Sequence, residues 1–218
     1  MSPPLTARED ILARIRAALP DLKVPVEASH ASITRSYCHF SGLDRAGCLQ
    51  LFIDKLIDYD TEVIELTDET ELPAGIKQAL QDAGEDRLLV PSGPLRTLVA
   101  EDVNVCVDHG LTTPELDCAQ AVLTRCEAAV ASTGTIFLVH GGDQGRRALT
   151  LLPDHHICIV RRDQVYGSIP EALTAIGSQS ARPITSISGP SATSDIEMVR
   201  IRGVHGPRRL TVLLHGDL

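Results

Sequence analysis

The sequence contains no C-x-x-C pair, although it has six cysteines. Iron–sulfur clusters and structural zinc sites need clustered thiolates, and the cysteines here are scattered along the chain. No histidine and cysteine stand at zinc spacing either. We therefore expect this chain to bind neither an iron–sulfur cluster nor a metal ion.

Several catalytic motifs are also missing. Residues 141–145 are rich in glycine, but neither the G-x-G-x-x-G fingerprint of dinucleotide-binding proteins nor the G-K-[ST] ending of a P-loop is present. The G-x-S-x-G elbow of α/β-hydrolases is absent as well. These gaps argue against a bound dinucleotide, a P-loop nucleotide site and serine hydrolase chemistry.

Basic residues and long apolar runs are scarce. The 20 lysines and arginines are outnumbered by 29 aspartates and glutamates, which gives a net charge of −9 and makes a nucleic-acid-binding surface improbable. No apolar run approaches the length of a membrane span. Arg8, Glu9 and Asp10 stand where a signal peptide would be apolar. We expect a soluble, cytoplasmic protein without a membrane span.

Strand-like and helix-like segments alternate from about residue 41 onward. Before them, Thr6 and Glu9 form a capping-box pattern that predicts a helix ending near Leu19, followed by an irregular stretch. The sequence thus predicts an N-terminal helix and arm over residues 1–40 and a single α/β domain over residues 41–218, with an open layered sheet and helices on both faces. The expected helices are 44–58, 73–83 and 170–176, and the expected strands are 62–66, 88–90, 103–107, 121–130, 135–139, 156–160, 184–187 and 210–214.

Residues 187–207 (ISGPSATSDIEMVRIRGVHGP) are the most informative segment. Ser191, Thr193 and Asp195 alternate after a glycine and a proline, a pattern that suits a turn with exposed N–H groups and hydroxyls for an anionic ligand. The alternative is a helix capped by Ser191 or Thr193, with Asp195 in its first turn. His205 lies between Gly203 and Gly206, where the chain can approach a ligand closely.

Two further segments carry candidate ligand-binding residues. Thr133, Gly134 and Thr135 can present N–H groups and hydroxyls to an oxyanion, or they can form an ordinary hairpin turn with Gly134 at positive φ. Arg146 and Arg147 can each bind a carboxylate or phosphate. Because neighbouring residues of a helical turn diverge, we expect one arginine to face the ligand and the other to form a surface ion pair.

Taken in order, these motifs resemble the LUD-domain family, in particular its lactate utilization protein C branch. The resemblance rests on residues 133–135 (TGT), 145–149 (GRRAL), 153–156 (PDHH), 189–197 (GPSATSDIE) and 203–207 (GVHGP). It covers about residues 85–216, and Ser132 stands where the family usually has a glutamate. The resemblance implies the fold shared by sugar-phosphate isomerases and CoA transferases. In such sheets ligands bind at the carboxyl ends of the strands, where residues 188–195 would then lie.

The resemblance also implies a function. It indicates an accessory or substrate-handling subunit of a system that oxidises L-lactate to pyruvate, with a small anionic ligand and with iron–sulfur clusters in partner subunits. Such a chain would not be active alone. Two alternatives stay open: an independent enzyme acting on a small phosphorylated or CoA-linked acid, and a scaffold subunit without catalysis.

Overall fold

The computed structural model describes residues 6–19, 32–177, 182–194, 200–203 and 205–217. Contacts within the chain define two units, Met1–Tyr37 and Cys38–Leu218. The first contains helix α1 (Ala7–Ala18), which begins with the predicted capping box: Glu9 N–H donates to the Thr6 hydroxyl, and Thr6 N–H donates to the Glu9 carboxylate. The helix buries none of its residues.

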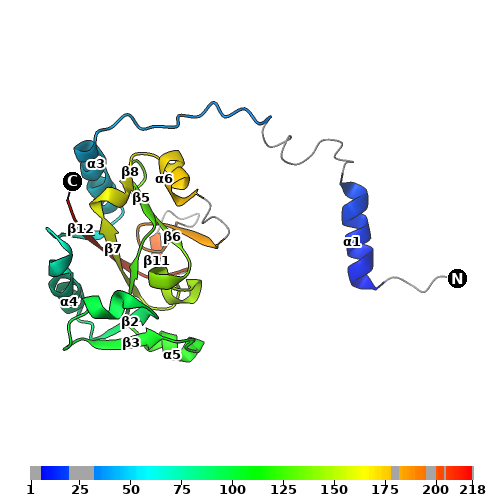
Figure 1. The fold of residues 1–218 in the computed structure, drawn as a ribbon. Coiled ribbons are helices and arrows are strands. Elements are labelled where there is room, and N and C mark those ends of the chain that lie inside the picture. The colour runs from blue at the N-terminus through cyan, green and yellow to red at the C-terminus, as the bar shows by residue number, and fades with distance from the viewer. Residues whose placement is uncertain (1–5, 20–31, 178–181, 195–199, 204, 218) are drawn as a thin grey trace. The chain divides into compact units, whose positions relative to one another are not determined.

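The second unit is built on a parallel sheet, which has six strands in the part of the chain that is described (Figure 1). The strand order is β1-β12-β7-β4-β2-β3. The bounds are β1 Glu62–Glu65, β2 Arg87–Pro91, β3 Asn104–Asp108, β4 Ala121–Arg125, β7 His155–Arg161 and β12 Arg209–His215. Helix α4 (Leu72–Ala83) covers one face, and helix α3 (Arg45–Asp58) covers part of the other. The predicted layered α/β fold with helices on both faces is therefore confirmed.

A smaller sheet lies on the same face of the large sheet as helix α3. Its order, among the described residues, is β8-β5-β6-β9, and β6 pairs antiparallel with both β5 and β9. The bounds are β5 Ala128–Val130, β6 Thr135–Val139, β8 Val165–Tyr166 and β9 Ile184–Ser188. Helix α6 (Ile169–Ile176) packs on its outer face. The sequence predicted one β-rich stretch over 121–130, whereas the structure divides it between the two sheets.

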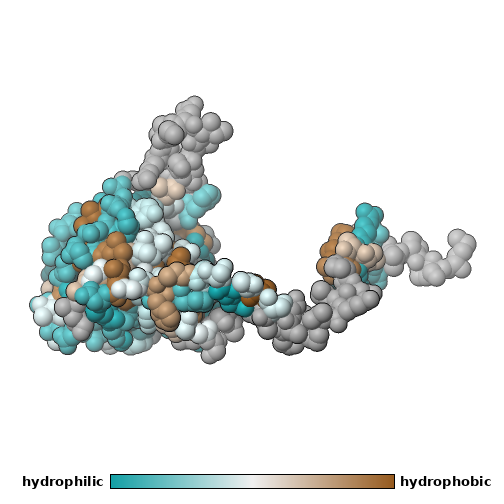
Figure 2. Space-filling view, turned by 90° about the horizontal axis from the view of Figure 1, so that it is seen from above, coloured by the Kyte–Doolittle hydropathy of each residue, from teal (hydrophilic) through white to brown (hydrophobic). Residues whose placement is uncertain are grey.

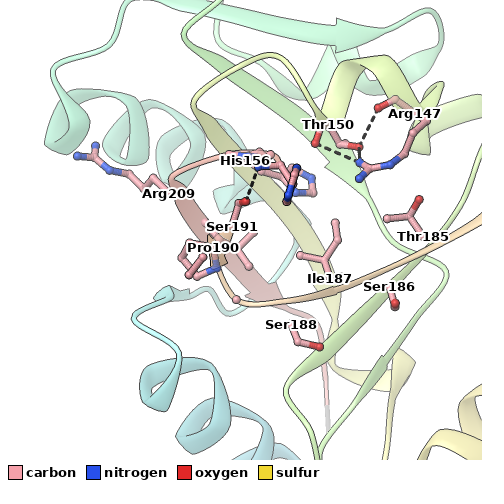
Figure 3. Close-up of a pocket in the computed structure, with 16 residues that line it drawn as sticks. Arg147, Thr150, His156, Thr185, Ser186, Ile187, Ser188, Pro190, Ser191 and Arg209 are labelled. Atoms are coloured by element: carbon pink, nitrogen blue, oxygen red, sulfur yellow. Dashed lines mark hydrogen bonds between the residues drawn. The ribbon is translucent and has the colours of Figure 1, made fainter. Parts of the chain in front are cut away.

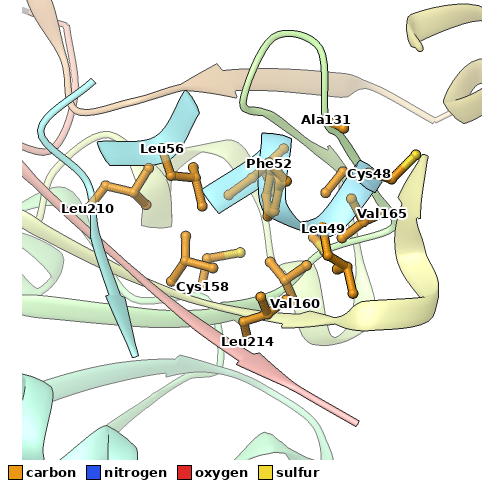
Figure 4. Packing of buried hydrophobic residues seen from close by; sticks show 14 of the residues in the cluster. Cys48, Leu49, Phe52, Leu56, Ala131, Cys158, Val160, Val165, Leu210 and Leu214 are labelled. Carbon is orange, nitrogen blue, oxygen red and sulfur yellow. The ribbon is translucent and has the colours of Figure 1, made fainter. Parts of the chain in front are cut away.

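The apolar core follows from strand alternation in the large sheet. Ile157 and Ile159 of β7 point to the α4 side, while Cys158 and Val160 point to the α3 side. On that second side, Phe52 and its neighbours on α3 fill the space between the two sheets (Figure 4). Strands buried on both faces read as continuous apolar runs, which is why these segments could be recognised from sequence.

Several short elements lie between the longer helices and strands. They are the 3₁₀ turns Glu69–Glu71, Pro94–Leu98, Gly142–Gln144, Arg147–Thr150 and Arg162–Gln164, the short helix α5 (Thr113–Asp117), and the antiparallel strands β10 (Ala192–Ser194) and β11 (Arg200–Arg202). Strand β10 excludes the helix that the sequence offered as one alternative for this segment, so Ser191 and Thr193 are not helix caps.

The surface of the second unit is mixed in polarity. In the view of Figure 2, brown apolar side chains stand in separate groups among teal polar ones. Among the helices that the structure describes, none combines the length and the apolar character that a membrane crossing requires.

Gly189, which follows β9, is expected to be intolerant of a side chain. Its φ is +78°, and a Cβ there would lie 2.6 Å from the Tyr59 Cβ. Gly84 ends α4 at φ +69° but has no atom within 4 Å of such a Cβ. Gly84→Ala should cost about 1–2 kcal/mol from backbone strain alone. Gly189→Ala should cost about 1–3 kcal/mol more, because Tyr59 must move. Urea unfolding of both variants measures this difference, and equal losses would contradict the packing described.

Candidate functional site

A pocket of about 260 Å³ lies where strand β9, the 3₁₀ turn Arg147–Thr150 and the first residues of β7 and β12 meet (Figure 3). Most of its wall is polar or made of backbone from the segment that follows β9. The lining residues are Arg147, Thr150, His156, Thr185, Ser186, Ile187, Ser188, Gly189, Pro190, Ser191, Ala192, His205, Gly206, Pro207, Arg209 and Leu210.

The position of this pocket corrects the sequence-based expectation. His156 and Arg209 stand at the beginning of β7 and β12, so the pocket lies at the amino ends of these parallel strands. The expectation that residues 188–195 lie at the carboxyl ends holds only if the strand before them belongs to the parallel sheet. Instead, β9 pairs antiparallel with β6 in the smaller sheet.

The two adjacent arginines have different surroundings, as predicted. Arg146 forms a bidentate ion pair with the buried carboxylate of Asp108, with Nε–Oδ2 and Nη2–Oδ1 distances of 2.8 and 3.0 Å. This hydrogen bond from Arg146 is the main reason that the pKa of Asp108 lies below its ordinary value. Arg146 is therefore neutralised and does not line the pocket, whereas Arg147 does.

Arg147 is oriented by its own turn. Its Nη1 donates to the Thr150 hydroxyl at 2.8 Å and to the Thr150 carbonyl at 3.2 Å. No carboxylate of the described residues forms a salt bridge with it. Partial burial lowers the pKa of Arg147 from its ordinary value, but a guanidinium stays charged at neutral pH. Within the described part of the chain, the Arg147 cation thus lines the pocket without a carboxylate partner, which suits an anionic ligand.

Ser191 and His205 also line the pocket, and backbone contacts hold them together. Ser191 N–H donates to the Pro207 carbonyl at 2.8 Å, and Gly203 N–H donates to the Ser191 carbonyl at 2.9 Å. His205 N–H donates to the Ser191 hydroxyl at 3.1 Å. Of the other residues predicted here, Thr193 pairs with Ile201 through the β10–β11 ladder, and Asp195 lies outside the described residues.

The predicted residues Thr133, Gly134 and Thr135 do not line the pocket. They belong to the hairpin between β5 and β6, and Gly134 has the positive φ (+60°) that the hairpin alternative requires. They are nevertheless linked to the site, because Thr133 and Thr135 hydroxyls lie 2.7 Å apart and Thr135 lies 2.8 Å from the hydroxyl of Ser188.

Ser132, which replaces the family's usual glutamate, is also in this hairpin. Its side chain is exposed, and its N–H donates to the Gly167 carbonyl at 3.2 Å. Like the three residues after it, Ser132 lies outside the lining of the pocket.

Adjacent histidines at the start of β7 point to opposite faces, as strand alternation predicts. His155 is buried between Glu85 and Thr211, at 2.7 and 2.8 Å. His156 lines the pocket, and its Nε2 lies 2.8 Å from the Thr124 hydroxyl. Burial lowers the pKa of His156 to about 3, so its imidazole is neutral at physiological pH. His156 therefore offers no positive charge to a ligand, whereas the arginines that line the pocket do.

Sequence reasoning missed several pocket residues, among them Thr150, Thr185 and Arg209, and it placed Ser188 in the expected segment 188–195 without naming it as a candidate ligand-binding residue. Thr185 and Ser188 lie on a strand whose polar residues could have indicated an edge strand with one open side. Thr150 and Arg209 carried no comparable signal. Among the described residues, no group of three or more histidine, cysteine, aspartate or glutamate side chains is placed to hold a metal ion.

Comparison with known proteins identifies the family. The LUD-domain model matches residues 9–215. The chain belongs to the LUD-domain family. It is 46% identical to a protein of Deinococcus radiodurans named lactate utilization protein C, over 80% of this chain and 82% of the relative. A Bacillus subtilis protein of the same name is 28% identical, over 72% and 73% of the two chains.

A solved structure supports the fold. The crystal structure of a DUF162 family protein from Deinococcus radiodurans matches with a TM-score of 0.69 and 41% identity. The match covers 80% of this LUD-domain chain and 99% of the other chain. The resemblance inferred from the sequence motifs is therefore confirmed.

The depressed pKa of His156 predicts a specific pH dependence of stability. A histidine in the unfolded chain takes up a proton near pH 6.5, whereas the folded chain keeps His156 neutral down to about pH 3. Stability is therefore lost as the pH falls below 6.5. Between pH 7 and pH 5 the wild-type free energy of unfolding should fall by about 2 kcal/mol more than that of His156→Gln, which has no such group. Urea unfolding at several pH values tests this, and parallel profiles would contradict it.

Proposed function

We propose that this protein is an accessory, substrate-handling subunit of a lactate utilization system, and that its pocket binds a small carboxylate. The observation that carries the proposal is the Arg147 guanidinium, which faces a small polar pocket without a carboxylate partner among the described residues. The names of the relatives from Deinococcus radiodurans and Bacillus subtilis connect this family to lactate.

The dimensions and chemistry of the pocket favour a small ligand. A volume of about 260 Å³ lies below the range typical of sites for drug-sized molecules, so it suits an acid of a few carbon atoms better than a complete CoA ester. The hydroxyls of Ser188 and Ser191 surround the site with hydrogen-bonding groups. A guanidinium matches the two oxygens of a carboxylate bidentately.

The accessory role follows from the electrons that the reaction releases. Oxidation of lactate to pyruvate removes two electrons and two protons, and an unactivated 2-hydroxy acid needs a redox carrier to accept them. The sequence has neither clustered cysteines nor a dinucleotide fingerprint. We therefore assign the carrier to partner subunits with iron–sulfur clusters, and we expect the isolated chain not to oxidise lactate.

Replacing Arg147 tests the proposed binding site. Arg147→Gln removes the charge but keeps a polar side chain of similar length. Its affinity for L-lactate, measured by isothermal titration calorimetry, should fall by about 10- to 150-fold, because a hydrogen bond to a charged group contributes about 1.5–3 kcal/mol.

Arg161→Gln is the matched control. Arg161 stands at the other end of β7, half-exposed, and pairs with Asp163. The variant removes the same charge away from the pocket, so it should bind L-lactate as the wild type does. Equal affinities of Arg147→Gln and the wild type would refute the site, and so would an equal loss in both variants.

A further inference from the structure

A buried histidine fixes the direction of one hydroxyl in the pocket. The Nε2 of His140 lies 2.7 Å from the Thr185 hydroxyl, and its Nδ1 lies 3.1 Å from the Gly145 carbonyl oxygen. A carbonyl only accepts hydrogen bonds, so in the ring form with a single proton that proton is on Nδ1. Nε2 then accepts, and the hydroxyl of Thr185 must donate its proton to it.

As a consequence, the Thr185 hydroxyl has no proton left to donate to a ligand. Thr185 lines the pocket, and the one proton of its hydroxyl is donated in the hydrogen bond to His140 Nε2. The oxygen can therefore accept a hydrogen bond from a ligand but cannot donate one. A ligand hydroxyl can donate a hydrogen bond to this oxygen. A ligand carbonyl oxygen has no proton to donate, so the lone pairs of the two oxygens repel each other.

The same histidine ties Thr185 to the arginine turn. Gly145, which His140 contacts, lies two residues before Arg147 in the chain. The backbone around His140 is itself held, because His140 N–H donates to the Pro183 carbonyl at 3.0 Å and Gly141 N–H donates to the Gly145 carbonyl at 2.9 Å. One imidazole thus connects the strand that carries Thr185 with the segment just before the Arg147–Thr150 turn.

We propose that Thr185 makes this pocket selective for 2-hydroxy acids over 2-oxo acids. The proposal rests on the proposed function, in which Arg147 binds the carboxylate. In both acids the distinguishing oxygen is on the carbon next to the carboxylate, so a group linked to the Arg147 turn is suited to sense it. The pocket then prefers the reduced member of the pair, L-lactate, over its oxidised product, pyruvate. His140 acts as a positioning residue for the Thr185 hydroxyl.

The test compares two affinities in each variant. Calorimetric titrations give the Kd for L-lactate and for pyruvate, and the ratio of the two values cancels general losses of binding. The wild type should favour L-lactate by about 2- to 10-fold, the range that one hydrogen bond contributes. Thr185→Val keeps the side-chain shape without the hydroxyl, so its ratio should approach 1. Thr185→Ser keeps the hydroxyl and should retain the preference. Thr185→Ala replaces Thr185→Val if that variant does not fold.

The possible outcomes separate the two proposals. A wild type that binds both acids equally, or a Thr185→Val variant with an unchanged ratio, overturns the role of Thr185 and leaves the carboxylate site intact. A wild type that binds neither acid overturns the proposed function together with the selectivity. Glycolate and glyoxylate form a second pair of the same chemistry, and the same change in ratio is expected for them.

Discussion

The antiparallel pairing of β9 with β6 determines where the pocket forms. With Ser188 opposite Thr135 and Ile184 opposite Val139, β9 becomes the edge of the small sheet, and the chain leaves it beside the amino ends of β7 and β12. The glycine that follows, Gly189, fits against Tyr59 at a positive φ. Each wall of the pocket therefore comes from a different part of the sequence. The register between β6 and β9 holds these segments together.

The ligand chemistry of the pocket depends on the different surroundings of two adjacent residues, Arg146 and Arg147. Asp108 pairs with Arg146 and thereby anchors the end of β3 to the residue just before the turn that begins at Arg147. Arg147 is left with Thr150 as its described partner and, like Arg209, brings a positive charge to the lining of the pocket. Around it, burial keeps His156 neutral, and the buried His140 directs the hydroxyl of Thr185. Arg147 and Arg209, together with these polar groups, give the described lining of the pocket the character expected of the proposed site for a small acid.

The sequence predicted the family, the layered fold and the different surroundings of the two arginines. These succeeded because they depend on local patterns: apolar runs for doubly buried strands, adjacent residues on one turn, and ordered motifs. It did not predict the second sheet, because β4 and β5 are separated by only two residues and both are apolar. The mistake about the carboxyl ends followed from that, since periodicity does not tell which sheet a strand joins. Thr185 was missed because the contact of its hydroxyl with His140 joins residues that are 45 apart in sequence.

Growth on L-lactate as the carbon source tests the central claim most directly. A clean deletion strain is complemented with the wild-type gene, Arg147→Gln or Arg161→Gln, with protein levels matched by immunoblot. The account predicts growth with the wild type and Arg161→Gln, and impaired growth with Arg147→Gln and with the empty vector. Normal growth of the deletion strain, with no second copy of the gene, would contradict the role in lactate utilization. Full complementation by Arg147→Gln would contradict the role of the pocket.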